Sequence, residues 1–328
     1  MLTVKPLDLA LPELQELLPS ALYSPHNISY QRAYMDGWDF EDVGFMLYER
    51  EDVLVAFVCA AGKTAGKSLS AWGLPAIFLR SPQLNSEHWN EVRNTTQKHL
   101  QKLFAAYPDA TFEFEEYPSD QGLSPVATTL LDGGVKPENT YSTTIPLSHP
   151  EDTLWSHIRK SYKSLIHKGE REFQRRLVDA ATVTTQDIEA FRSLHKTVSG
   201  RSTRSHASWL QQLEAIKANE AFAVFLFLDG DLIGASYFIC GSRRCYYGVG
   251  AYKRELFDRP IAHVALWQAI REAKRRGCAF FDMGRWHPKF CDVSEKEQNI
   301  SHFKRGFGGV AETSLLFSVP GLCSDILR

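Results

Sequence analysis

One stretch of the chain, residues 246–309, constrains the fold more than any other. It begins with an apolar strand at residues 246–251 and passes through a basic turn into a helix. The apolar residues of this helix recur at helical spacing and predict one buried stripe: Ala262, Leu266, Ala269, Ile270 and Ala273. Asp258 is expected to cap the start of the helix, Pro260 suits its first turn, and Gly277 can take the left-handed conformation that ends it.

A second strand at residues 279–283 follows, then a polar loop, a helix from about residue 294 and a Gly-rich segment at 303–309. This order of strand, helix, strand and helix gathers polar side chains where the strands end. In open α/β sheets, ligands bind in that crevice. The polar residues expected there are Arg254, Arg259, Asp282, Arg285, His287 and Lys304.

A length of 328 residues suggests two domains, which we place at residues 1–147 and 148–328. The net charge of −2 conceals a split between them. Residues 1–147 hold ten Lys and Arg against nineteen Asp and Glu, whereas the remainder holds twenty-seven against twenty. The second half is therefore the expected host of a polyanionic ligand, with an ordinary solvated basic face as the alternative.

Several common classes are not indicated. The first residues carry acidic side chains and prolines where a signal peptide has an apolar segment, and no apolar run approaches the roughly 20 residues that span a bilayer. We therefore expect a cytoplasmic protein without a transmembrane segment. The six cysteines form no CxxC pair, which favours buried reduced thiols and gives no metal site.

Both halves predict the same order of elements: strand or coil, two helices, a three-strand meander, helix, strand, helix and strand. In the first half we expect helices at 11–18, 29–35, 86–106 and near 125, and strands at 43–48, 53–59, 76–79, 111–117 and 141–145. In the second half we expect strands at 178–184, 222–228, 232–240 and 312–317, and helices at 186–198 and 206–219. The recurrence favours a duplication.

Residues 61–68, AGKTAGKS, match the loose phosphate-loop pattern. A true phosphate loop opens a long helix whose N-terminus faces the phosphates. Here Gly73 and Pro75 interrupt the following residues within two turns. We therefore interpret the segment as a hairpin loop that carries lysines.

Residues 152–176 join the halves and predict a helix with one apolar stripe and a cationic outer face. Such a face suits the phosphates of a nucleotide or of RNA, although basic solvated helices are common. The cations are Arg159, Lys160, Lys163, Lys168, Arg171, Arg175 and Arg176. A further basic loop at 199–205 is expected to bring Arg201 and Arg204 toward the second-half core as substrate-binding residues.

The order of elements in residues 178–317 resembles the GNAT acyltransferase fold. The strings LWSHIRKSYKSLIHKGER, HVALWQAIREAKRRGCAFFDMG and HFKRGFGG resemble the Fem family, tandem-GNAT aminoacyltransferases that extend peptidoglycan side chains from aminoacyl-tRNA. The resemblance covers residues 150–318 well and 1–147 in outline. It implies an α/β (α+β) fold of tandem GNAT-like domains, each a mixed, mostly antiparallel sheet flanked by helices, with a degenerate first domain.

The resemblance also implies a reaction, the attack of an acceptor amine on an activated acyl group without a covalent enzyme intermediate. Lys304 matches the lysine of the Fem FK-x-GFGG stretch and would neutralise acceptor carboxylate or oxyanion charge. Asp282 and Arg285 would orient the acceptor. His263 is the candidate proton acceptor by position, with a packing role as the alternative, and the substrates themselves can handle the proton in this family.

One departure from ordinary GNAT proteins bears on the donor. Those that use acetyl-CoA cradle its pyrophosphate in a Gly-x-Gly loop, but here residues 253–263 contain no glycine. Arg254 and Arg259 would have to hold a CoA donor instead. Tyr246 and Tyr247 would line the acyl slot, or pack in the core.

The sequence thus favours an N-acyltransferase without a bound cofactor. Its donor substrate would be aminoacyl-tRNA, and its acceptor an amine of a cell-envelope precursor, nucleotide-linked compound or peptide-like metabolite. One alternative is an acyl-CoA-dependent enzyme that acts on an amino sugar of a surface polysaccharide. Another is an inactive module that binds RNA or a nucleotide sugar.

Overall fold

The computed structural model describes residues 2–35, 37–63 and 67–321, which form two compact units. Unit 1 consists of Met1–Pro19, Met35–Thr140 and Thr313–Arg328, and unit 2 of Ser20–Tyr34 and Tyr141–Glu312. These units differ from the predicted domains 1–147 and 148–328 because a short N-terminal segment joins unit 2 and the C-terminal segment joins unit 1. Neither the composition nor the periodicity of the sequence indicates that these terminal segments belong to the other unit.

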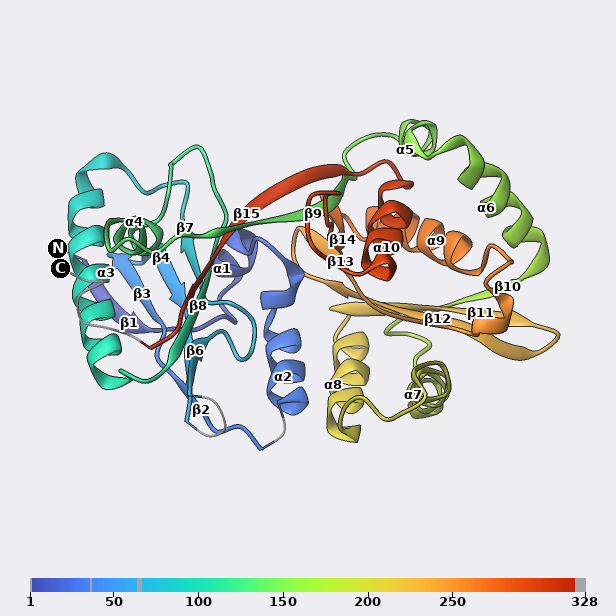
Figure 1. Cartoon of the computed structure of the whole chain (residues 1–328), viewed down its shortest axis with the longest axis horizontal. Helices are drawn as coiled ribbons and strands as arrows, with labels where there is room; N and C mark the ends of the chain where they lie inside the picture. Colours follow the sequence, from blue (N-terminus) through green and yellow to red (C-terminus); the bar gives the residue numbers. More distant parts are fainter. Residues whose placement is uncertain (1, 36, 64–66, 322–328) are drawn as a thin grey trace. The chain divides into compact units, whose positions relative to one another are not determined.

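Unit 1 packs its helices against two groups of strands (Figure 1). The helices are α1 (Pro12–Leu17), α3 (Ser86–Ala106) and α4 (Pro125–Asp132). One antiparallel sheet has the order β1 (Thr3–Pro6), β3 (Phe45–Glu49), β4 (Asp52–Val58) and β7 (Ile77–Arg80). The other group has the order β15 (Val310–Val319), β8 (Thr111–Glu116), β6 (Ser68–Ser70), β5 (Ala60–Gly62) and β2 (Phe40–Asp42).

The phosphate-loop pattern falls on β5 and β6, which pair antiparallel with Ala61 opposite Leu69. It is a hairpin, as predicted, and its residues 64–66 lie outside the described part of the chain. The pattern ends in strand β6, whereas a true phosphate loop would be followed by a helix.

Unit 2 is a mixed sheet with helices on both faces. The strand order is β10 (Gln174–Val178), β11 (Ala221–Leu228), β12 (Asp231–Cys240), β13 (Arg244–Tyr252), β14 (Phe280–Arg285) and β9 (Glu138–Pro146). The pairs are antiparallel except β13 with β14, which is parallel. The helices are α2 (Pro25–Tyr34), α5 (Glu151–His157), α6 (Lys160–Glu172), α7 (Thr185–Ser199), α8 (His206–Lys217), α9 (Ile261–Arg275) and α10 (Glu295–Arg305), with 3-10 turns η1 (Ala21–Tyr23) and η2 (Arg254–Leu256). Helices α6 and α9 lie on one side of β11 and β12, and α7 and α8 on the other (Figure 1).

Helix α9 forms for the predicted reasons at its core and its end, but not at its start. Four residues of its apolar stripe are buried and Ala262 is half-buried, and Gly277 just beyond the helix has φ +83°. Against expectation, Asp258 does not cap it: Pro260 occupies the N-cap position, and no side chain bonds there. The helix approaches α6 closely, since a Cβ on Gly169 would lie 3.1 Å from that of Val264.

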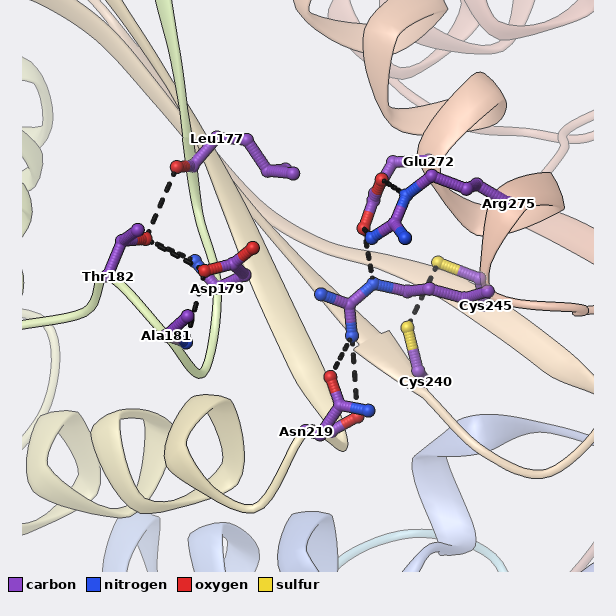
Figure 2. A network of polar contacts seen from close by, with 10 residues as sticks. Leu177, Asp179, Ala181, Thr182, Asn219, Cys240, Cys245, Glu272 and Arg275 are labelled. Carbon is purple, nitrogen blue, oxygen red and sulfur yellow. Dashed lines mark hydrogen bonds and ion pairs between the residues drawn. The ribbon is translucent and has the colours of Figure 1, made fainter.

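A polar network fixes the C-terminal end of α9, and Figure 2 shows the carboxylate of Glu272 at its centre. Glu272 is buried and accepts hydrogen bonds of 2.7 Å from both Arg275 and Arg276. Burial alone would raise the pKa of Glu272, but these two guanidinium groups outweigh it and hold the pKa below its usual value. Arg276 also donates to Oδ1 of Asn219 at 2.8 Å and so joins α9 to the segment after α8.

The predicted buried, reduced thiols are confirmed at four positions, Cys59, Cys240, Cys245 and Cys278, while Cys291 is half-buried. Cys323 lies outside the described residues. In residues 2–35, 37–63 and 67–321, no group of three or more His, Cys, Asp or Glu side chains is placed to hold a metal ion. In the same ranges, no helix combines the length and apolarity needed to cross a membrane.

Two predicted elements were wrong in extent. The predicted helix at 152–176 breaks between α5 and α6, where Ile158 and Arg159 have extended ψ angles of 136° and 133°. Burial of Ile158 and a bond from the Arg159 N–H to the Gly306 carbonyl override helix propensity there. The predicted strand at 178–184 instead ends at Val178, because the next residues form a turn in which Thr182 Oγ1 donates to Asp179.

Candidate active site

The parallel strands β13 and β14 part from each other near the predicted site residues. Their pairing runs from Arg244 with Phe280 to Tyr246 with Asp282. Beyond that point β13 continues to Tyr252 beside β12 alone. The end of β14 therefore offers side chains and backbone groups that no longer face a hydrogen-bonded neighbour on the β13 side.

Gly284 leaves a space at this parting. Its φ is +79°, and a Cβ built on it would lie 3.0 Å from Oη of Tyr246 and 3.2 Å from Nζ of Lys304. A left-handed glycine is thus the residue that lets a hydroxyl and an ammonium group converge on one point. Three predicted site residues, Tyr246, Asp282 and Lys304, are brought together here.

Asp282 supplies a buried carboxylate to this space. The residue is only 6% exposed, and its carboxylate accepts a hydrogen bond from the N–H of Gly284 at 2.7 Å. Burial raises the pKa of Asp282 to about 6, although the Gly284 bond and the charges of Arg244 and Lys304 oppose the shift. The carboxyl group therefore changes charge just below neutral pH.

Lys304 lies in the last turn of α10 and is half-buried. Burial lowers the pKa of its ammonium group, and the negative charge of Asp282 counteracts part of that effect. Its Nζ donates to the carbonyl oxygen of Arg285 at 3.5 Å, which is a long and weak hydrogen bond. An ammonium group with three donors, held this loosely, retains capacity for an oxygen of a substrate.

The glycines after Lys304 allow close packing around the end of α10. A Cβ on Gly306 would lie 2.2 Å from the ring of Tyr162, and one on Gly308 would lie 2.8 Å from the carbonyl oxygen of His157. Gly308 also has φ +86°. The Gly-rich segment thus fixes where α10 ends, and with it the position of Lys304.

Sequence reasoning missed the ion pair beside Asp282. Arg244 donates to both oxygens of Glu312, at 2.9 and 3.2 Å, and Thr144 donates to one of them at 2.9 Å. Arg244 precedes Tyr246 by two residues and therefore shares its face of β13. That alternation was a usable signal for Arg244. Nothing near Glu312 in the sequence indicated its partner.

His263 lies in an aromatic environment. Its ring centroid is 4.4 Å from that of Tyr162 and 5.0 Å from that of Phe303, both in edge-on geometry. Burial, with a smaller contribution from the charge of Arg159, lowers the pKa of His263 to about 4. The imidazole is therefore neutral near pH 7, and this geometry fits the packing alternative.

Three further predicted residues make contacts that do not involve Gly284, or are exposed. Tyr247 stacks on Phe238 at 5.4 Å, and burial raises its pKa well above the usual value. Arg204 donates to the Tyr30 hydroxyl at 2.7 Å and lies 3.6 Å above the ring of Trp209. Arg201 is exposed in the loop between α7 and α8. Their substrate-binding roles stay predictions.

The loop between β13 and α9 occupies the place of the CoA cradle in ordinary GNAT proteins. Its backbone N–H groups bond within the loop: those of Leu256, Phe257, Arg259 and Ile261 donate to nearby carbonyls. Pro260 has no N–H to offer. Arg259 pairs with Glu172 at 2.8 Å, and Arg254 is exposed.

Comparison with known proteins identifies this part of the chain. Residues 156–305 match the family model described as Acetyltransferase (GNAT) domain. The matched range is less than half of the chain and makes up most of unit 2. No curated protein sequence matches the chain.

Solved structures extend the likeness in fold to both units. FemX is 11% identical, with a TM-score of 0.73 over 97% of this chain and 98% of that one. L-PGS from Bacillus licheniformis is 12% identical, with a TM-score of 0.57 over 96% and 95%. A tandem GNAT protein from the clavulanic acid biosynthesis pathway is 11% identical, with a TM-score of 0.55 over 97% and 98%. The predicted resemblance to Fem and tandem GNAT proteins is thus confirmed at the level of the fold.

Proposed function

We propose that this protein is an N-acyltransferase that moves an aminoacyl group from aminoacyl-tRNA to an amine of a cell-envelope precursor or peptide-like metabolite. The observation that carries the proposal is the convergence of Lys304, Tyr246 and buried Asp282 on the space at Gly284. It combines a cation with a carboxylate at the strand ends of a GNAT domain, where an acyl group and an amine can be held in contact.

In the proposed step, the neutral amine attacks the ester carbonyl of the donor. A C–N bond forms, the C–O bond to the terminal ribose breaks, and the proton lost by the amine ends on the ribose oxygen. Lys304 stabilises the negative oxygen of the tetrahedral intermediate, and Asp282 favours the charged form of Lys304. This route leaves the proton with the substrates and needs no basic side chain.

The loop before α9 supports an RNA donor over CoA. A pyrophosphate cradle needs free N–H groups that converge on the ligand. Here the N–H groups of Leu256, Phe257, Arg259 and Ile261 already serve turns, so a phosphate could not engage them without breaking those bonds.

Helix α6 supplies the surface that a polyanionic donor needs. Its exposed cations include Lys160, Lys168 and Arg171, while Arg175, just beyond it, is paired with Glu170 at 3.1 Å. A row of cations along one helix suits successive phosphates and makes binding sensitive to salt.

The test incubates the full-length protein with pools of charged tRNA, or with labelled acyl-CoA, together with candidate amines. Transfer from charged tRNA that ribonuclease abolishes, and that Lys304→Ala depresses, supports the proposal. Transfer from acyl-CoA that ribonuclease does not affect would favour the CoA-dependent alternative. An absence of transfer from either donor, with RNA or nucleotide-sugar binding retained, would favour an inactive binding module.

A further inference from the structure

Beside Lys304, three aromatic rings and one guanidinium group form a compact cluster, which we call the ring platform: Tyr141, Trp286, Phe290 and Arg305. The ring of Tyr141 meets those of Trp286 and Phe290 edge-on, with centroids 5.6 and 6.1 Å apart. The guanidinium carbon of Arg305 lies 4.7 Å from the centroid of Trp286. The cluster thus combines flat apolar faces with a cation.

The ring of Phe290 is exposed although its loop is held by several hydrogen bonds, while Tyr141 and Trp286 are half-buried. Phe290 is 78% exposed, which is unusual for so large an apolar side chain. The loop that carries it is tied to α10, since the His287 N–H donates to Ser301 Oγ at 3.0 Å and Gln298 donates to the Pro288 carbonyl at 3.2 Å. The backbone N–H of Trp286 donates to the backbone carbonyl of Tyr141 at 2.9 Å. The exposed ring is therefore presented by a fixed backbone.

The platform adjoins both the candidate active site and the basic helix. Trp286 directly follows Arg285, whose carbonyl contacts Lys304. On the other side, the Arg159 N–H donates to the Gly306 carbonyl at 2.9 Å, and its guanidinium lies 2.9 Å from Nε2 of His302. The cations of α6 thus begin beside the C-terminal end of α10, where Arg305 is located.

Charges around the platform favour an anionic partner on the Lys304 side. Exposed Arg285, Lys289 and Arg305 flank the rings. The nearby acidic residues lie in the segment that leads into α10 and in its first turn: Asp292, Glu295 and Glu297. Glu297 is engaged in the capping box with Ser294. The anionic part of a ligand would accordingly lie toward the C-terminal end of α10 and α6.

We propose that the ring platform stacks an unpaired nucleobase near the acceptor end of the RNA donor, while α6 holds the phosphates that precede it. This inference rests on the proposed function and assigns the donor's bound end to named residues. Exposed aromatic rings interleaved with cations are the usual means of binding single-stranded nucleic acid, because every base has a flat face to stack. Arg305 adds a second planar cation that can contact a base or a phosphate.

The experiment measures binding of a fluorescein-labelled single-stranded RNA ending in CCA to the full-length protein by anisotropy over a range of salt concentrations. Phe290→Ala is the test variant, and because Phe290 is 78% exposed the substitution removes little packing. Phe257→Ala is the matched control, since Phe257 is also an exposed phenylalanine, at 63%, but lies before α9. We expect Phe290→Ala to weaken binding by about five- to tenfold and Phe257→Ala by less than about twofold.

Salt dependence separates the two parts of the inference. Removing a neutral ring should leave the slope of log affinity against log salt unchanged, whereas Lys168→Gln should reduce it by about one. Equal affinity of Phe290→Ala and wild type in an enzyme that transfers from charged tRNA would overturn the platform and leave the proposed function standing. Failure of wild type to bind the RNA would overturn both. A loss of UDP binding in Phe290→Ala with RNA binding intact would assign the platform to a nucleotide-linked acceptor instead.

Discussion

Replacing Gly284 with alanine tests the candidate active site most directly. The substitution has two separable effects. The first is backbone strain, because φ is +79° and an L-residue in the left-handed region costs about 1–2 kcal/mol. The second is local: the new methyl group would lie 3.0 Å from the hydroxyl of Tyr246 and 3.2 Å from Nζ of Lys304. Both atoms end flexible side chains, so they would be displaced rather than block folding.

Gly277→Ala provides a matched control. Gly277 has φ +83°, almost the same backbone conformation, but a Cβ there would meet nothing within 4 Å. Urea unfolding should therefore show a similar loss of stability in both variants, of about 1–2 kcal/mol. Transfer should differ, because the hydroxyl of Tyr246 and the ammonium group of Lys304 would each have to shift by a few tenths of an ångström, and misplacing a reacting group lowers the rate.

We expect Gly284→Ala to lower the single-turnover rate of transfer by at least about tenfold, equivalent to about 1.4 kcal/mol, and Gly277→Ala to lower it by less than twofold. The rates are measured at a donor concentration that saturates each variant. If the two variants transfer at the same rate, the space at Gly284 is not where the reaction occurs. If Gly284→Ala loses several kcal/mol more stability than Gly277→Ala, the contacts are structural and the reasoning about displacement is wrong.

Four further changes test single components of the site and donor surface. Lys304→Ala should slow transfer by at least about tenfold, as expected for the loss of one oxyanion partner, and unchanged turnover in the folded variant would remove Lys304 from the mechanism. Asp282→Asn tests the pKa of about 6 for Asp282. Because folding raises that pKa, wild type should lose up to about 3 kcal/mol of stability relative to the variant as pH rises from about 4 to 6, and the difference should stay constant above pH 7. A stability difference in urea unfolding that does not vary with pH would refute the assignment. His263→Leu should retain transfer within about threefold, because the imidazole is neutral and packed among aromatic rings, whereas a loss above about a hundredfold would restore it as the proton acceptor. Lys168→Gln should leave the maximal transfer rate unchanged while the apparent donor affinity weakens most at low salt; equal weakening at all salt concentrations would argue against a phosphate contact.

The sequence predicted most of the elements because their signals are local. Helical spacing of apolar residues and a terminal glycine identified α9. The strands predicted at 222–228 and 232–240 are β11 and β12, and Asp229 and Gly230 form the turn between them. The break between α5 and α6 was not predictable, because it depends on a bond from Arg159 to Gly306, which lies far away in the sequence. Strand β10 lies closer to the N-terminus than the strand predicted at 178–184, for a related reason. Arg175 and Arg176 were assigned to the end of the predicted helix, but pairing with β11 makes them part of the strand.

In the candidate site, too, residues with a local signal were predicted and residues that depend on distant contacts were not. Lys304, Asp282 and Tyr246 were predicted because a family resemblance or a strand end marked them. Gly284 was not, since its role depends on a tyrosine and a lysine that approach it from two other elements. The Arg244 and Glu312 pair was missed because 68 residues separate its members. Residues that converge only after the sheet has formed leave no periodic trace in the sequence.

The two units support a duplication in a way that element order alone does not. In unit 1, Ala76, which directly precedes β7, forms an isolated parallel bridge with Phe114 of β8, much as the pairing of β13 with β14 ends after Tyr246 and Asp282. Two residues past its bridge, β8 carries the buried carboxylate of Glu116, which accepts from Ser124 and pairs with buried Arg80 at 3.4 Å. In unit 2 the corresponding position is Gly284, and the cation beside it contacts a carbonyl oxygen at 3.5 Å. One unit thus pairs its buried charges internally at the strand parting, while the other leaves an ammonium group loosely held. This difference supports the prediction of a degenerate first domain and the proposal that the chemistry takes place in unit 2.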